Sequence, residues 1–300
     1  MNPTASQYTE GDIAVIFVKH VRSPEAPVLL PDGSWLLVEM DPDRGCVTHI
    51  GADGQTRHVV ARTGRPNGLA LDKAGVVWVA ESLEPALIRL TLNGKFERVL
   101  TACDGEPFRW PNDLAFGPDG ALYMTDSGIL WKDWNQRRAE YNSLYLDGRV
   151  YRIDTNTMKA TILDSGLSFA NGIAFGPDRN LYVNATVSGM VYRYHWSDGR
   201  VGKREEFGDV VDRSLPESFR GPDGMKFGAN GDLYVATVAQ QDVTVLDPNG
   251  KVKRRIRLDG PRPTNIAFGP QGSKKIYVTE QGIGQFEVYE VETDGLPLYD

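Results

Sequence analysis

The segment LAFGPDGALYMTDS, residues 114–127, recurs in altered form along the 300-residue chain and decides the expected fold. Each copy has an apolar stretch, a turn rich in Pro, Asp or Gly, and an aromatic-rich stretch with alternating apolar residues. This pattern predicts a β-hairpin, because Asp-Gly and Asn-Gly tolerate the positive φ angles of tight turns. The six copies begin at Pro27, Leu69, Leu114, Ile173, Met225 and Ile266.

The spacing of the copies sets the size of the repeating unit. Successive turn residues lie 42, 45, 59, 52 and 41 positions apart, which leaves room for about four short strands per unit. A second hairpin pattern follows most copies, as in GRVYRID (148–154), and helical periodicity is not sustained for three turns. We therefore predict an all-β fold in which residues 1–300 form a single domain. This domain is a six-bladed β-propeller, with four antiparallel strands per blade around a central channel. Residues 13–18 are expected to pair with the C-terminal blade and close the ring.

Composition excludes several classes of partner. A formal charge of -7 and a pI near 5.3 argue against nucleic acid, since binding rests on basic residues that neutralise phosphates. The longest apolar runs are far shorter than the roughly 20 residues of a membrane span, and the N-terminal residues lack a signal-peptide pattern. Cys46 and Cys103 have no metal-ligand spacing and are expected to be free thiols in a reducing cytoplasm.

A polar residue precedes each repeated strand, and equivalent positions of successive blades surround one axis. Asn and Asp before Gly are also common turn formers, but here oxygen-bearing side chains are found in all six units. Two carboxylates and several amides, without Cys or His, suit a hard cation, so we expect one divalent metal, with Ca²⁺ favoured over Mg²⁺, Mn²⁺ or Zn²⁺. Without a metal or a shared proton, the two acids would repel each other. The predicted ring consists of Glu25, Asn67, Asn112, Asn171, Asp223 and Asn265.

These residues resemble the SMP-30/gluconolactonase/regucalcin-like propellers, which include drug-responsive lactonases and are distant relatives of diisopropylfluorophosphatase. The resemblance runs from Glu25 to about Tyr289. It is most specific in three segments: WPNDLAFGPDGALYMTDS (110–127), FANGIAFGPDRNLYV (169–183) and GPDGMKFGANGDLYVA (221–236).

The resemblance implies a metal-dependent lactonase that acts on a small lactone or ester. By it, Glu25, Asn171 and Asp223 are metal ligands, and Asn112 is a fourth ligand or a substrate contact. In the implied mechanism Asp223 is also the general base that accepts a proton from metal-activated water. The family's first ligand usually stands in Glu-Gly-Pro, whereas this chain has Ala26 in place of the glycine, a change expected to leave the carboxylate in place.

Substrate contacts are less sharply defined by the sequence. Asn67, Asp126 and Asn265 are candidates for the substrate rim or for simple turn caps. The sugar-lactone hydrolases of the family commonly have an arginine where this chain has Trp110, so an indole here favours a substrate with an aromatic or apolar part.

The longest spacing holds an insertion, residues 127–147. Two placements are open for its aromatic residues Trp131, Trp134 and Tyr141, and one of them is a lid over the mouth of the channel. The alternative is that they pack onto the blade below or onto another subunit of a homo-oligomer.

Three other functions remain open on the same scaffold. One is hydrolysis of a phosphotriester or fluorophosphate, since the same metal and carboxylates can polarise P=O. Another is a non-enzymatic calcium-binding propeller, because propellers host many functions. The third is a strictosidine-synthase-like condensation by a carboxylate acting without metal.

Overall fold

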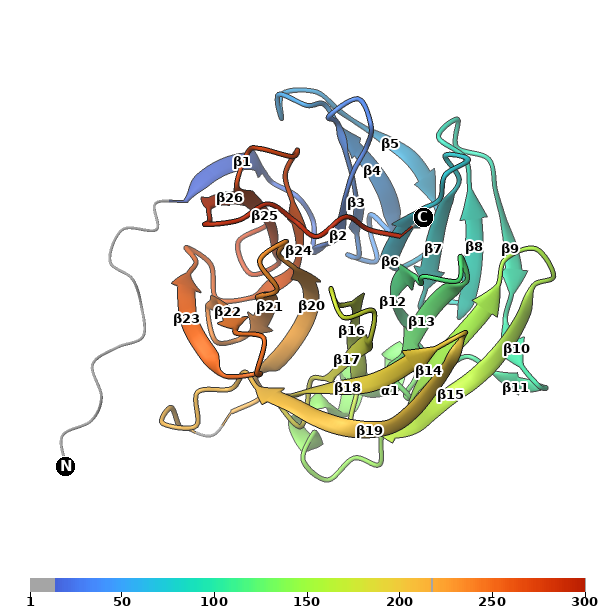
Figure 1. Ribbon diagram of the computed structural model, residues 1–300. Coiled ribbons are helices and arrows are strands. Elements are labelled where there is room, and N and C mark those ends of the chain that lie inside the picture. The colour runs from blue at the N-terminus through green and yellow to red at the C-terminus, as the bar shows by residue number, and fades with distance from the viewer. Residues whose placement is uncertain (1–13, 217, 300) are drawn as a thin grey trace, which may run out of the picture.

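The computed structural model describes residues 14–216 and 218–299. Six four-stranded antiparallel sheets stand around a common centre (Figure 1), which confirms the six-bladed propeller. The first two blades are β2 (Pro24–Leu29), β3 (Trp35–Glu39), β4 (Cys46–Ile50) and β5 (Arg57–Arg62), then β6 (Pro66–Leu71), β7 (Val77–Glu81), β8 (Ala86–Leu90) and β9 (Phe96–Leu100). The third and fourth are β12 (Pro111–Phe116), β13 (Leu122–Asp126), β14 (Gly148–Asp154) and β15 (Lys159–Leu167), then β16 (Ala170–Phe175), β17 (Leu181–Ala185), β18 (Met190–Ser197) and β19 (Arg200–Asp209). The fifth is β20 (Gly221–Phe227), β21 (Leu233–Val238), β22 (Asp242–Leu246) and β23 (Val252–Arg257).

The sixth blade is built from both ends of the chain. Its strands are β24 (Pro263–Phe268), β25 (Lys275–Glu280), β26 (Gln285–Glu290) and, on the outside, β1 (Val15–Lys19). β1 pairs with β26 in an antiparallel register that sets Val15 opposite Val288 and Lys19 opposite Gln285. The predicted closure by residues 13–18 is therefore confirmed from Val15 onward, while Ile13 lies outside the described residues.

Hydrophobic cores lie between the blades rather than within them. Side chains alternate along each strand, so the middle strands of one blade supply residues to two different cores. On β13, Tyr123 packs toward the fourth blade against Phe175, and its neighbour Met124 packs toward the second blade with Trp78. The same arrangement continues to the sixth and first blades, where Phe286 meets Trp35.

The remaining elements are short. The insertion between β13 and β14 contains α1 (Trp131–Arg137) and a 3₁₀ turn, η1 (Arg138–Glu140), and a small hairpin is formed by β10 (Ala102–Cys103) and β11 (Glu106–Pro107). Within residues 14–216 and 218–299, the helices are too short and too polar to pass through a bilayer. The C-terminal segment crosses the centre of the ring (Figure 1) and is held by isolated bridges from Gly295 to Gly228 and from Tyr299 to Phe116.

Candidate active site

The innermost strand of every blade is irregular at its beginning. Pairing with the second strand of the blade is interrupted within the first residues, for example between Pro66 and Leu69 and between Pro222 and Met225. The other four blades have the same interruption. Such bulges redirect side chains, and here each one holds a polar residue at the same mouth of the channel.

These six side chains line one cavity of about 540 Å³. Five are the predicted residues at positions 25, 67, 112, 171 and 223. The sixth is Thr264, which shows that the prediction for the last blade was wrong by one residue. Asn265 lies one step further along β24, so its side chain points away from the cavity, as alternation along a strand requires. Its Nδ2 donates to Glu25 Oε1 at 2.6 Å, and Asn265 therefore supports Glu25 from below.

Glu25 and Asp223 are the two acids of the cavity. Glu25 is 3% exposed, and Asp223 is partly open to the cavity. Burial raises the pKa of Glu25 to about 7, against the hydrogen bond from Asn265. Burial and the charge of Glu25 both raise the pKa of Asp223. Among the described residues, neither acid has an ion pair within 4.0 Å, although the charge of Arg262 lowers the pKa of Asp223 against the effect of burial.

The backbone at Ala26 explains why glycine is usual after the first acid. Ala26 has φ of 48°, in the left-handed region that glycine adopts most readily. The methyl group costs about 1–2 kcal/mol there, but the Glu25 carboxyl still faces the cavity.

Asn112 and Asn171 are fixed by hydroxyl groups that directly follow the second strand of their own blades. Asn112 Nδ2 donates to Ser127 Oγ at 2.9 Å, and Asn171 Nδ2 donates to Thr186 Oγ1 at 3.0 Å. These hydrogen bonds set the orientation of each amide. The Asn171 side chain also lies beside Asp223 and lowers the pKa of that carboxyl against the effect of burial.

Asn67 connects the ring to the aromatic wall. Its Oδ1 accepts hydrogen bonds from Trp110 Nε1 at 3.0 Å and from Arg65 Nη1 at 3.3 Å, and its Nδ2 donates to Asn112 Oδ1 at 3.3 Å. Asn67 thus orients an indole, a guanidinium and a second amide at once.

The predicted substrate residues in the insertion divide into two groups. Trp131 lines the cavity together with Trp110 and Trp134, so part of the insertion forms its wall. Tyr141 does not line it and packs on Phe219, with ring centroids 5.3 Å apart. The aromatic residues of the insertion therefore pack onto neighbouring blades of the same chain as well as facing the cavity.

Asp126 is likewise absent from the cavity. Its carboxylate is 1% exposed and accepts hydrogen bonds from the backbone N–H groups of Arg109, Trp110 and Gly128. The structure thus favours the cap that the sequence left open for this residue over a substrate contact.

Three arginines in the cavity were missed by the sequence interpretation: Arg65, Arg138 and Arg262. Arg65 is 7% exposed, and its guanidinium carbon lies 4.8 Å from the ring centroid of Trp110 and 5.2 Å from that of Trp131. Burial lowers its pKa to about 10, so the group stays charged at neutral pH. Two of the three stand in Arg-Pro pairs directly before an inner strand, at Arg65-Pro66 and Arg262-Pro263, a signal that could have revealed them.

The sequence model for the SMP-30/Gluconolactonase/LRE-like region matches residues 82–282. A gluconolactonase of Zymomonas mobilis is 26% identical over 280 residues, which are 86% of this chain and 76% of that protein. A diisopropyl-fluorophosphatase of Loligo vulgaris is 27% identical over 79% of this chain and 75% of its own length. A strictosidine synthase-like protein of Arabidopsis thaliana is 31% identical, but over 58% of this chain and only 45% of that protein.

Solved structures share the architecture. A calcium-binding protein from Agrobacterium tumefaciens, regucalcin, superposes with a TM-score of 0.78 over 96% of this chain and 98% of that one, at 20% identity. At this identity the likeness concerns the fold alone. Since the family match covers more than half of the sequence, this chain belongs to the SMP-30/gluconolactonase/LRE-like family of β-propellers.

Proposed function

We propose that this protein is a metal-dependent hydrolase that opens a lactone ring. One observation carries the proposal: Glu25, Asn112, Asn171 and Asp223, from four different blades, meet in one cavity of about 540 Å³ at the channel mouth. A gluconolactonase among the relatives, similar over 86% of this chain, supports the reaction class.

The donor set fits a divalent cation. It offers two carboxylates and two amide oxygens, and within the described chain no three His, Cys, Asp or Glu side chains gather as a metal-binding group. Oxygen donors of this kind favour Ca²⁺, with Mg²⁺ and Mn²⁺ next and Zn²⁺ least favoured. Burial raises the pKa values of Glu25 and Asp223, and a bound cation would favour the ionised form of both carboxylates. When bound, such an ion polarises a carbonyl group and acidifies water.

The protein's own groups then have distinct tasks. Asp223, partly open to the cavity, accepts a proton from the attacking water, and Glu25 stays fixed by its hydrogen bond from Asn265. Trp110 and Trp131 cover one side of the cavity and exclude water. Because each group is held by its neighbours before substrate arrives, little reorganisation is needed during the reaction.

Substrate recognition combines aromatic and cationic groups. Trp131, Trp134 and Phe219 offer apolar surface for an aromatic or aliphatic part of the lactone. Arg65 and Arg262 face the same cavity, and Arg262 Nε is buried without a hydrogen-bond partner among the described residues. We therefore propose a lactone that carries both an apolar part and a carboxylate or another anionic substituent.

The test is a hydrolysis assay of the full chain on aliphatic, aromatic and carboxylated lactones, before and after chelation and with Ca²⁺, Mg²⁺, Mn²⁺ or Zn²⁺ added back. Activity should disappear with chelator and return with one ion. Asp223→Asn should lower kcat by about 10³-fold or more. Asp198→Asn, which removes an exposed carboxylate that does not line the cavity, is the matched control and should retain activity. Full activity in Asp223→Asn, with its folding checked by circular dichroism, would exclude the assigned base.

A second candidate reaction is hydrolysis of a phosphotriester or fluorophosphate. The similarity to a diisopropyl-fluorophosphatase over 79% of this chain is the reason to test this second reaction. A fluorophosphate assayed beside the lactones separates the two reactions by kcat/KM. A condensation reaction that persists in the presence of chelator would instead favour the strictosidine-synthase-like hypothesis, in which a carboxylate acts without metal.

A further inference from the structure

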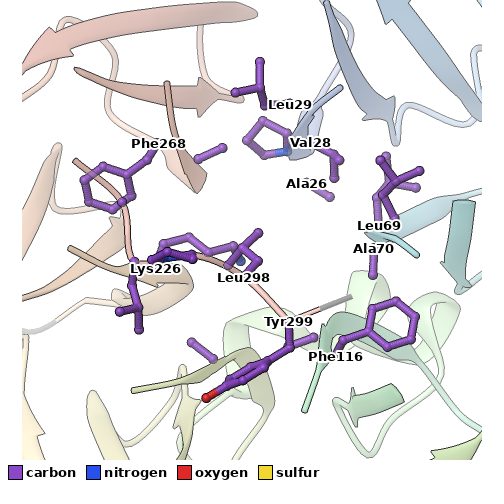
Figure 2. A pocket seen from close by; sticks show the side chains of 18 of the residues that line it. Ala26, Val28, Leu29, Leu69, Ala70, Phe116, Lys226, Phe268, Leu298 and Tyr299 are labelled. Carbon is purple, nitrogen blue, oxygen red and sulfur yellow. The ribbon is translucent and has the colours of Figure 1, made fainter. Parts of the chain in front are cut away.

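A second cavity lies at the opposite end of the same six inner strands. It has a volume of about 500 Å³, a size typical of small-molecule sites. Each inner strand begins at the candidate active site and ends here, as β12 does with Asn112 at one mouth and Phe116 at the other. Figure 2 shows its walls, which carry mostly apolar side chains.

The cavity exists because small residues occupy one repeated position. Three residues after the polar ring, five of the inner strands carry an alanine or a valine, and the fifth blade alone carries a lysine. All six residues line the cavity: Val28, Ala70, Ala115, Ala174, Lys226 and Ala267. The short side chains leave space on the channel axis, and Lys226 places one cationic group among apolar neighbours (Figure 2).

Between the levels of the two cavities, neighbouring inner strands pack backbone against backbone. A Cβ atom at Gly68 would overlap the backbone of Asn112, and one at Gly172 would overlap that of Asp223. Neighbouring inner strands therefore approach each other too closely at this level for a side chain to fit between them. Among the described residues, none lines both cavities. Asn265 connects them, because it lines the second cavity and its Nδ2 donates to Glu25 Oε1 at 2.6 Å.

The C-terminal segment forms the outer wall. Residues 295–299 line the cavity, and their backbone is tied to the blades by the Leu296 N–H, which donates to Phe227 O at 2.9 Å. Tyr299 packs edge-on to Phe175, with ring centroids 5.9 Å apart. This segment belongs to no blade, and it covers apolar surface that would otherwise face the channel opening.

Lys226 forms no ion pair within 4.0 Å in the part of the chain that the structure describes. Asp113 lines the same cavity, and its carboxylate accepts hydrogen bonds from the N–H groups of Leu114 and Ile173. Burial raises the pKa of Asp113, and the Lys226 charge opposes that shift. No ion pair within 4.0 Å joins the two, and Lys226 is partly exposed to the cavity.

We infer that this cavity binds an aliphatic carboxylic acid, with the chain against the apolar walls and the carboxylate on Lys226. A compact ammonium on a flexible stem binds an anionic head as a point charge, and the surrounding alanines and phenylalanines suit methylene groups. The inference does not rest on lactone hydrolysis, because the six residues that line the mouth at the candidate active site do not line this cavity.

Calorimetric titration of the full chain with hexanoate, octanoate and decanoate tests the inference. Affinity should rise about fourfold for each added methylene. Lys226→Met should weaken decanoate binding about tenfold or more, whereas Lys226→Arg should keep it within about threefold. Decan-1-ol should bind the unchanged protein more weakly than decanoate and should be insensitive to Lys226→Met.

Controls locate the binding. Lys251→Met removes an exposed lysine and should leave decanoate binding unchanged. Arg65→Met removes a cation of the candidate active site and should also leave it unchanged. Ala174→Leu fills the cavity and should weaken the acid and the alcohol alike. The inference is overturned if no acid binds, if decanoate binds Lys226→Met as well as the unchanged protein, or if Arg65→Met rather than Lys226→Met abolishes binding.

Discussion

Trp110 and Arg65 occupy equivalent positions in neighbouring blades and contact each other. The indole stands two residues before Asn112, and the guanidinium comes from the equivalent place in the neighbouring blade, two residues before Asn67. The two groups lie 4.8 Å apart and share Asn67 as hydrogen-bond partner. Since one face of the indole is turned to Arg65, Trp110 offers less free apolar surface than its sequence position suggests.

Arg65 is therefore expected to discriminate between substrates. Arg65→Met removes the charge and retains an apolar stem, so KM for a carboxylated lactone should rise about tenfold or more, and KM for a neutral lactone should change by less than about threefold. Arg65→Lys should give an intermediate value for the carboxylated lactone, because it keeps the charge without the planar fork. Steady-state kinetics on a matched pair of lactones measures the ratio, and an equal effect on both would contradict anion recognition.

At the scale of elements, an acidic residue at the end of the second strand of a blade holds the loop before the inner strand of that blade through a backbone hydrogen bond. Glu39, Glu81, Asp126 and Glu280 all do this in their own blades, each by accepting a backbone N–H from a residue just before the inner strand. In the third blade, Asp126 also accepts the backbone N–H of Trp110. Asp126, which lies outside the cavity, therefore helps to position Trp110, which lines it.

Asp126→Asn tests this fastening. Oδ1 of Asp126 accepts from Trp110 and Gly128, and Oδ2 accepts from Arg109. The asparagine amide has one accepting oxygen and one donating NH₂ group. At least one backbone N–H that now donates to the carboxylate would therefore face another donor and lose its hydrogen bond. The free energy of unfolding should fall by about 1–3 kcal/mol, measured by urea denaturation, and KM should rise as Trp110 moves. Asp198→Asn serves again as the exposed control; equal stability of the two variants would show that the fastening contributes little.

The repeat predicted the elements better than it predicted individual contacts. Strand spacing and turn residues gave six blades, and five of the six ring residues stand where the pattern placed them. The prediction for Asn265 was wrong because a one-residue shift on a strand reverses the side-chain direction. The sequence could not decide between the alternatives for Asp126 and Tyr141, because their partners, the backbone of residues 109–110 and the ring of Phe219, belong to segments outside the repeat.

At the scale of the whole molecule, non-repeating segments complete the ring. β1 supplies the outer strand of the last blade, and residues 295–299 cover the second cavity. Six cores, each shared by two adjacent blades, link every blade to its neighbours. We propose on this basis that the ring unfolds as a single domain, since the loss of one blade would expose two cores.

Two valines of β1 offer a matched test of closure. Val18 is 8% exposed in the core between the last and first blades, whereas Val15 is 63% exposed on the same strand. Val18→Asp places a carboxylate among Trp35, Phe286 and Ile50, and should lower the free energy of unfolding by about 3–5 kcal/mol. Val15→Asp should change it by less than about 0.5 kcal/mol. Urea denaturation followed by both tryptophan fluorescence and circular dichroism should give one coincident transition in each protein, shifted only for Val18→Asp. Separate transitions for the two probes would contradict a single unfolding unit. Only the buried valine contributes to the shared core, so equal stability of the two variants would mean that pairing of β1 with the last blade does not stabilise the ring.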